Sequence, residues 1–147
     1  MTMQDRFKFR VWLKDSEQYV EEEASECHIN HNGELICGDW VDDGYCGHYD
    51  YFNDDEVIIE QCTGLKDRNG KLIYEGDILG GLYGAYIKWC PKHCGYGLFY
   101  SYGNQDHCMH CEGDVIWDEV TEDDGQFEVV GNIHENADLL ENKDESI

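Results

Sequence analysis

Proline, lysine and arginine are scarce in this chain of 147 residues. Pro91 is the single proline, and ten basic residues face 33 acidic ones, which gives a formal net charge of −23. No lysine or arginine occurs between Asp15 and Glu60. Because so negative a surface repels phosphate groups, we expect no direct binding to nucleic acid or to an anionic membrane. The charge fits a solvated acidic surface, and it also fits a surface that imitates nucleic-acid phosphates.

Long apolar runs are also missing. The longest uncharged stretch rich in apolar residues, residues 78–87, is about half of the ~20 residues that a membrane-spanning helix needs. The N-terminal residues lack the apolar segment of a secretory signal. We therefore expect a cytosolic protein, in which the eight cysteines serve as metal ligands or packed thiols before they serve as disulfides.

Signatures of catalysis are absent as well. The chain has no Gly-x-Ser-x-Gly motif and no phosphate-binding glycine loop. Its few serines lie in acidic surroundings or, for Ser101, within an aromatic strand. The sequence therefore predicts no catalytic residue, no organic cofactor and a non-enzymatic protein.

Short apolar segments recur about every ten residues, with glycine-containing turns between them and almost no helical periodicity. This pattern is typical of all-β proteins, and residues 57–133 suit a small barrel of about five strands. Asn136 is expected to cap a short helix over residues 137–140. The expected strands include residues 6–13, 57–59, 82–89, 96–102, 115–120 and 127–133.

Two Asn-Gly pairs predict hairpin turns. Asn69-Gly70 lies between apolar runs and favours a type I′ turn, in which both central residues have positive φ. Asn32-Gly33 is a second candidate and would close a hairpin over residues 29–36.

Four cysteines are arranged as two close pairs. Thirteen residues separate Cys90-x3-Cys94 from Cys108-x2-Cys111, the layout of a zinc ribbon in which each pair lies on a tight turn. Four thiolates would complete a tetrahedron around Zn²⁺ and leave no open position for catalysis. His93, at the x2 spacing from Cys90, can replace Cys94 as the fourth ligand. The alternative is four reduced, partly buried thiols.

A thiol–disulfide role for the Cys108–Cys111 pair is disfavoured by its surroundings. Asp106, Glu112 and Asp114 lie close in sequence, and their charges would raise the pKa of the thiols, which opposes formation of a reactive thiolate. Cys62 is expected to be a packed strand residue.

A second group of metal-ligand residue types lies upstream, with irregular spacing. The group could hold a second metal, and it could also consist of loop histidines and small core cysteines, which is the interpretation we prefer. Its members are Cys27, His28, His31, Cys37, Cys46 and His48.

Three segments resemble the YopX family of phage and prophage proteins. They are TGLKDRNGKLIYEGDIL at residues 63–79, VVGNIHENADLL at residues 129–140 and KFRVW at residues 8–12, about a quarter of the chain. The resemblance implies an SH3-like barrel with a small C-terminal helical turn, a phage or prophage origin and a bacterial cytoplasmic setting. It implies no reaction and no catalytic residue. The segment from Cys90 to Cys111 departs from the usual family pattern.

Taken together, the sequence predicts an acidic, β-rich N-terminal lobe at residues 1–60 and an SH3-like barrel at residues 61–140. The barrel would carry a zinc-ribbon-like insertion at residues 89–112, and residues 141–147 would form a polar tail. Exposed edge strands would allow a homo-oligomer.

The predicted function is that of a non-enzymatic accessory protein with a structural zinc, which binds a host or phage protein. One alternative is an acidic mimic of nucleic acid that occupies the basic groove of a host defence or regulatory enzyme. A second alternative is a metal-dependent enzyme that uses the upstream histidine and cysteine group.

Overall fold

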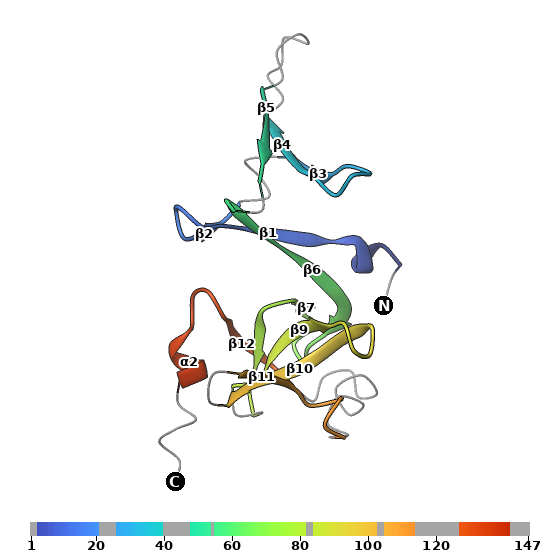
Figure 1. Ribbon diagram of the computed structural model, residues 1–147, viewed down its shortest axis with the longest axis vertical. Coiled ribbons are helices and arrows are strands. Elements are labelled where there is room, and N and C mark those ends of the chain that lie inside the picture. Colours follow the sequence, from blue (N-terminus) through green and yellow to red (C-terminus); the bar gives the residue numbers. More distant parts are fainter. Residues whose placement is uncertain are drawn as a thin grey trace. The chain divides into compact units, whose positions relative to one another are not determined.

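The computed structural model describes residues 3–20, 26–39, 48–53, 55–81, 84–102, 105–113 and 127–141. These residues form strands, a 3-10 helix η1 (Met3–Phe7) and a short helix α2 (Asp138–Glu141), as Figure 1 shows. The prediction of an all-β protein with a small C-terminal helix is confirmed. The chain divides into two compact units, residues 10–60 and residues 1–9 with 61–147. Residues 1–9, assigned to the N-terminal lobe from sequence, lie in the second unit.

Two groups of strands build the unit of residues 10–60. In the first group, β1 (Phe9–Leu13) pairs with β2 (Gln18–Tyr19), and β6 (Val57–Lys66), whose residues 61–66 belong to the other unit, follows β1 in the sheet order. In the second, β3 (Glu26–Ile29), β4 (Leu35–Asp39) and β5 (His48–Phe52) form an antiparallel meander. The carboxylate of Glu60, 3% exposed, accepts hydrogen bonds from Arg10 and from the Tyr19 hydroxyl, so its charge is compensated.

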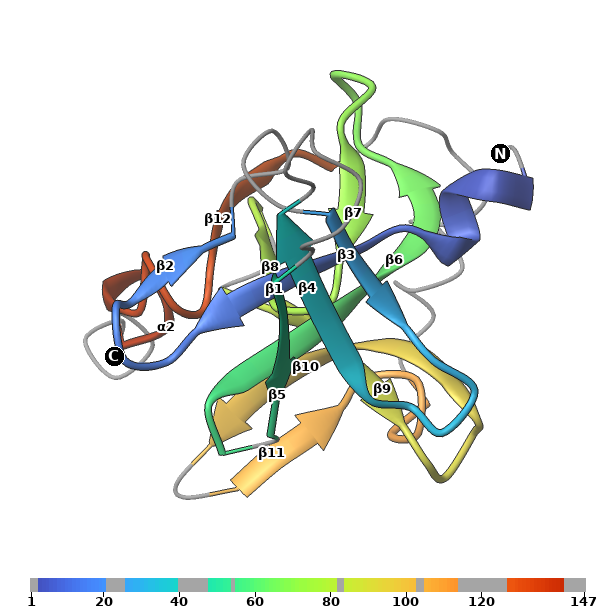
Figure 2. The same cartoon turned by 90° about the horizontal axis from the view of Figure 1, so that it is seen from above.

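Five strands build the main sheet of the other unit, in the order β11-β10-β9-β8-β12. They are β8 (Asp77–Leu79), β9 (Tyr86–Cys90), β10 (Gly95–Tyr102), β11 (Gln105–Cys108) and β12 (Val129–Asn132). The last strand returns to pair with β8 (Figures 1 and 2). The cysteine-rich segment is continuous with this sheet, because β9, β10 and β11 supply three of its five strands.

Buried side chains lie on both faces of this sheet. One core cluster contains Ile73 from β7 (Leu72–Tyr74), Leu79, Ala85, Ile87, Leu98 and Met109. A second contains Ile78, Tyr86, Cys90, Phe99 and Cys108. Because neighbouring residues of a strand point to opposite faces, the alternation along β8, β9 and β10 divides the apolar side chains between the clusters. Cys90 and Cys108 are therefore fixed in a packed layer.

The turn at Asn69-Gly70 closes a hairpin but is not of type I′. Gly70 has a φ of 80°, whereas Asn69 is not among the described residues with positive φ. The Gly70 N–H donates to the Asp67 carbonyl at 3.0 Å, and the Asp67 carboxylate accepts the N–H groups of Asn69 and Lys71. This is a type I turn followed by a glycine bulge, because the aspartate side chain holds the turn in that form.

The helix α2 begins two residues after Asn136. The Leu139 N–H donates to the Asn136 carbonyl at 3.0 Å, as expected at a helix start. The Asn136 side chain, however, accepts the N–H of Asn132 at 3.1 Å, so it stabilises the preceding turn.

Some sequence predictions fall outside the described residues. They concern the strand over residues 115–120, Cys46 and the tail beyond residue 141. Across the described part of the chain, no helix is long and apolar enough to cross a membrane.

Candidate metal centre

The sheet topology gathers the cysteine-rich turns at one place. β9 ends at Cys90 and β10 begins opposite it at Gly95, so residues 91–94 form the turn between them. β11 pairs with the other side of β10 and ends at Cys108, opposite Phe99. The following residues turn, with the Glu112 N–H donating to the Cys108 carbonyl at 3.2 Å. Both turns therefore belong to the same antiparallel meander.

Four potential ligands converge there: Cys90, His93, Cys108 and Cys111. Their ligand atoms all lie within 4.8 Å of one another. Cys90 Sγ lies 3.6 Å from Cys111 Sγ, and His93 Nδ1 lies 3.4 Å from Cys111 Sγ and 3.7 Å from Cys108 Sγ. A tetrahedral zinc with bonds of about 2.3 Å to sulfur and about 2.0 Å to nitrogen separates its ligand atoms by roughly 3.5–3.8 Å. The cluster has the dimensions of such a centre.

Cys94 lies outside this group. Its side chain is exposed, and its Sγ lies 3.6 Å from the Pro91 carbonyl oxygen. It adopts a φ of 52°, the left-handed conformation that usually favours glycine. His93, the alternative that the sequence left open, is the residue that lies with the other three cysteines.

The imidazole of His93 is oriented for metal binding. Its Nδ1 faces the sulfurs of Cys108 and Cys111, while its Nε2 lies 3.2 Å from the Tyr96 carbonyl oxygen. These contacts assign the proton to Nε2, which donates to Tyr96 and leaves the Nδ1 lone pair directed at the sulfurs. A second hydrogen bond of this kind is a regular feature of metal-bound histidine.

Two glycines of β10 provide the space for the ligands. A Cβ on Gly97 would lie 2.9 Å from Cys108 Sγ and 3.2 Å from His93 Cε1. A Cβ on Gly95 would lie 3.2 Å from His93 Cδ2. Gly97 was not among the residues predicted to shape the site, although a glycine inside a strand is a signal of close approach by another group.

The thiols of the cluster differ in acidity. Burial acts to raise the pKa of Cys90, but backbone hydrogen bonds from His93 and Lys92 and contacts with the other thiols lower it to about 6. Burial and hydrogen bonds with Cys90 and Cys108 raise the pKa of Cys111 to about 11. The Cys90 thiolate thus forms readily, and its negative charge opposes ionisation of Cys111. A divalent cation would remove this repulsion, since it favours every deprotonated ligand.

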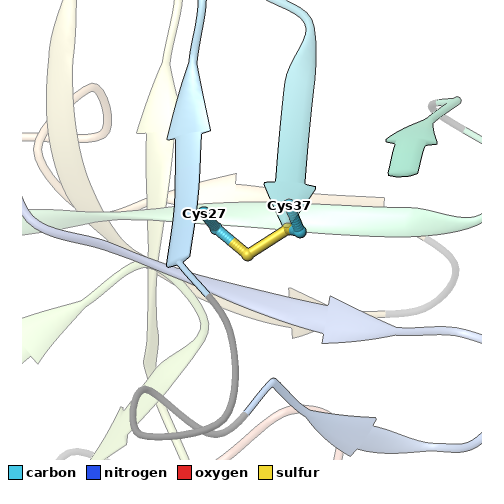
Figure 3. Close-up of a disulfide and its surroundings, with 2 residues drawn as sticks. All are labelled: Cys27 and Cys37. Carbon is cyan, nitrogen blue, oxygen red and sulfur yellow. A yellow bond between two sulfur atoms is a disulfide. The ribbon is translucent and has the colours of Figure 1, made fainter. Parts of the chain in front are cut away.

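The upstream group is organised differently from the sequence expectation. Cys27 and Cys37 form a disulfide, with their Cα atoms 4.1 Å apart (Figure 3). The two residues are directly opposed on the antiparallel strands β3 and β4, so the register itself brings the sulfurs together. The expectation of ligands or free thiols is wrong for this pair.

The histidines of that group form no described metal cluster. His28 and His31 are exposed. Among the described residues, only the downstream group brings three or more potential metal ligands together. Cys62 is confirmed as a packed strand residue, 1% exposed in β6.

Comparison with protein families agrees with this fold. The family model described as YopX protein matches residues 8–141, almost the whole chain. The chain belongs to the YopX family. The resemblance seen in the sequence is thereby confirmed, and the metal cluster lies within the matched residues.

This YopX-family chain is similar to a solved structure titled protein EF1440 from Enterococcus faecalis. The sequence identity is 26%, the match covers 90% of this chain and 96% of that one, and the TM-score is 0.49. No curated protein matches the chain.

Proposed function

We propose that this YopX-family protein is a non-enzymatic accessory protein that binds another protein and whose sheet is held together by a structural zinc ion. The observation that carries the proposal is the closed set of Cys90, His93, Cys108 and Cys111. Three thiolates and one imidazole are the ligands that zinc prefers, and four of them complete its tetrahedron. No ligand position is left for a substrate, which supports a structural role.

The zinc would connect parts of one sheet. Its ligands come from the end of β9, the β9–β10 turn, the end of β11 and the turn beyond it. Metal binding to such a site contributes on the order of 10 kcal/mol to folding of the segment, because the site does not exist in the unfolded chain.

Metal content and two adjacent variants test the zinc site. The purified protein is expected to contain one zinc per chain, measured by elemental analysis. His93→Ala should lose most of the metal and melt at least about 10 °C lower, since it removes a ligand of a folding-coupled site. Cys94→Ser, the neighbouring control, should keep the metal and the melting temperature. Loss of zinc in Cys94→Ser but not in His93→Ala would contradict this assignment.

The partner is proposed to be a host or phage protein with a basic groove, in the bacterial cytoplasm. The net charge of −23 favours such a partner, because opposite charges accelerate encounter and fix orientation. The same charge supports a second candidate function, in which carboxylates imitate nucleic-acid phosphates and block a host enzyme.

Capture from bacterial lysate distinguishes the two functions. The protein is immobilised, incubated with lysate at low and high salt, and its partners are identified by mass spectrometry. A nucleic-acid enzyme that is lost at high salt and displaced by DNA supports the mimic. A partner retained at high salt and unaffected by DNA supports the accessory protein with a partly apolar interface. Capture of no protein at either salt concentration would contradict both.

A further inference from the structure

The candidate zinc centre forms part of the wall of a surface pocket. The pocket has a volume of about 250 Å³, and Cys90, Cys108 and Cys111 line it together with Lys88, Lys92 and His107. By the same measure, a cavity needs only about 10–15 Å³ to hold one water molecule. A small solute can therefore approach the sulfur atoms.

The three cysteines of the centre differ in exposure. Cys90 is 3% exposed and Cys108 is 7% exposed, whereas Cys111 is an exposed residue of the turn that follows β11. A reagent that enters the pocket thus meets Cys111 with the least steric hindrance. Access is one of the properties that select which cysteine reacts.

The sulfur atoms also differ in their hydrogen bonds. Backbone hydrogen bonds from Lys92 and His93 reach Cys90. Within the described residues, the side-chain contacts of the Cys111 sulfur come from the other ligands, Cys90, Cys108 and His93. An N–H donor withdraws electron density from a thiolate, so the hydrogen bonds at Cys90 make that sulfur a weaker nucleophile.

We infer that Cys111 is an oxidation site, at which a peroxide converts Cys111 and Cys90 to a disulfide and the zinc is released. The inference rests on the proposed zinc centre. The two sulfurs already lie 3.6 Å apart, so little movement is needed to join them. Nearby carboxylates do not prevent the reaction, because a metal-bound thiol is deprotonated whatever its pKa in the free state.

The reaction consumes one peroxide. The Cys111 thiolate attacks one oxygen of hydrogen peroxide, the O–O bond breaks, and hydroxide leaves as the sulfenic acid forms. The Cys90 thiolate then attacks the Cys111 sulfur, an S–S bond forms and a second hydroxide leaves. Two protons taken up from the buffer convert the two hydroxides to water. The two thiolates lose two electrons, the peroxide gains them, and the zinc loses two anionic ligands.

The experiment uses the Cys94→Ser protein, so that the exposed thiol outside the centre does not compete. The sample is first shown to contain zinc and then treated with an equal concentration of hydrogen peroxide. Zinc release is followed with a chromogenic chelator, and the modified cysteines are identified by mass spectrometry. We expect stoichiometric zinc release together with a Cys90–Cys111 linkage, and at early times modification of Cys111 about tenfold faster than of Cys108.

Two results would overturn the inference. One is zinc retention with unmodified Cys111 at a peroxide concentration that oxidises free glutathione in the same buffer. The other is earlier oxidation of Cys108 or of the buried Cys62 than of Cys111. Absence of zinc from the starting protein would instead contradict the proposed function, so the two failures are distinguishable. Cys111→Ser, if it still binds zinc, should release it at least about tenfold more slowly.

Discussion

At the scale of single residues, the candidate centre depends on glycines, which have no side chain, as well as on its ligands. Gly97 lies where a Cβ would be 2.9 Å from Cys108 Sγ, closer than such atoms approach in proteins. The sulfur is buried in a packed layer, so it has little freedom to withdraw. The absence of a side chain at Gly97 therefore allows Cys108 to lie close to the backbone of β10.

Gly97→Ala should weaken zinc binding by about tenfold or more, because the displaced sulfur no longer completes the tetrahedron. Gly95→Ala should have a smaller effect. Its Cβ would lie 3.2 Å from a ring carbon of His93, which is a longer contact and involves no sulfur ligand. Competition with a zinc chelator measures both affinities. Equal affinities for the two variants, or a weaker one for Gly95→Ala, would contradict this order.

The ligand types could be predicted from the sequence, but the complete set could not. Paired spacing identified Cys90, Cys108 and Cys111, because two tight turns separated by a hairpin bring such residues together. The choice between His93 and Cys94 depends on which of two adjacent side chains the first turn directs inward. That choice follows from backbone conformation and from the Tyr96 carbonyl that receives the His93 Nε2–H.

At the scale of elements, the two hairpin turns follow one rule. In Asp67-Arg68-Asn69-Gly70-Lys71 and in Asn30-His31-Asn32-Gly33-Glu34, the first side chain accepts the N–H groups of the third and fifth residues. Only the glycine has positive φ in each. The sequence predicted both hairpins from Asn-Gly alone, but the turn type is set by the residue two positions earlier.

Asp67 makes the stronger of these turns. It is 5% exposed, and its carboxylate also accepts the Val129 N–H of β12 at 3.1 Å. Burial acts to raise the pKa of Asp67, but three backbone N–H groups and the nearby Lys71 outweigh it, so the pKa is lowered. Asp67→Ala should cost about 1–3 kcal/mol, because buried N–H groups lose their acceptor. Asn30→Ala, in the exposed hairpin, should cost less.

The pH dependence of stability provides a second test at this site. A lowered pKa in the folded state stabilises the protein above the unfolded pKa of about 3.9, and this contribution is lost as pH falls through the folded pKa. Urea unfolding at several pH values should therefore show the difference between wild type and Asp67→Asn narrowing below about pH 4. A difference that widens on acidification would refute this account of Asp67.

At the scale of the whole molecule, one compact unit contains a disulfide and the other contains the candidate metal centre. The unit of residues 10–60 has the Cys27–Cys37 disulfide, and the unit of residues 1–9 and 61–147 has the candidate zinc centre. Small units bury little apolar surface, so cross-links contribute a large share of their stability. At a sequence separation of 10, the disulfide should contribute about 2–3 kcal/mol.

The two cross-links should respond to different reagents. A zinc chelator is expected to accelerate amide hydrogen exchange in residues 86–113 and leave residues 26–39 unchanged. A phosphine reductant should have the opposite effect, because it opens the disulfide without removing the metal. Exchange followed by mass spectrometry measures both regions in one sample. Acceleration of both regions by either reagent alone would contradict the separate action of the cross-links.

The all-β class was predictable because strand alternation and glycine turns are local signals along the chain. Cys27–Cys37 was not, because its formation depends on the register of β3 against β4 and not on cysteine spacing. The place of β9, β10 and β11 in the main sheet was also missed, because these strands join the rest of the sheet through the pairing of β9 with β8, which lies outside the cysteine-rich segment.

All four candidate ligands lie in one short segment, residues 90–111. They converge at the antiparallel meander of β9, β10 and β11, which the same segment helps to form. A site of this kind does not depend on coordinated change in distant parts of the coding sequence. It can be gained or lost by recombination of a single small DNA segment, provided that the recipient has an antiparallel meander of matching length. Relatives with and without the centre could then share the same remaining sheet.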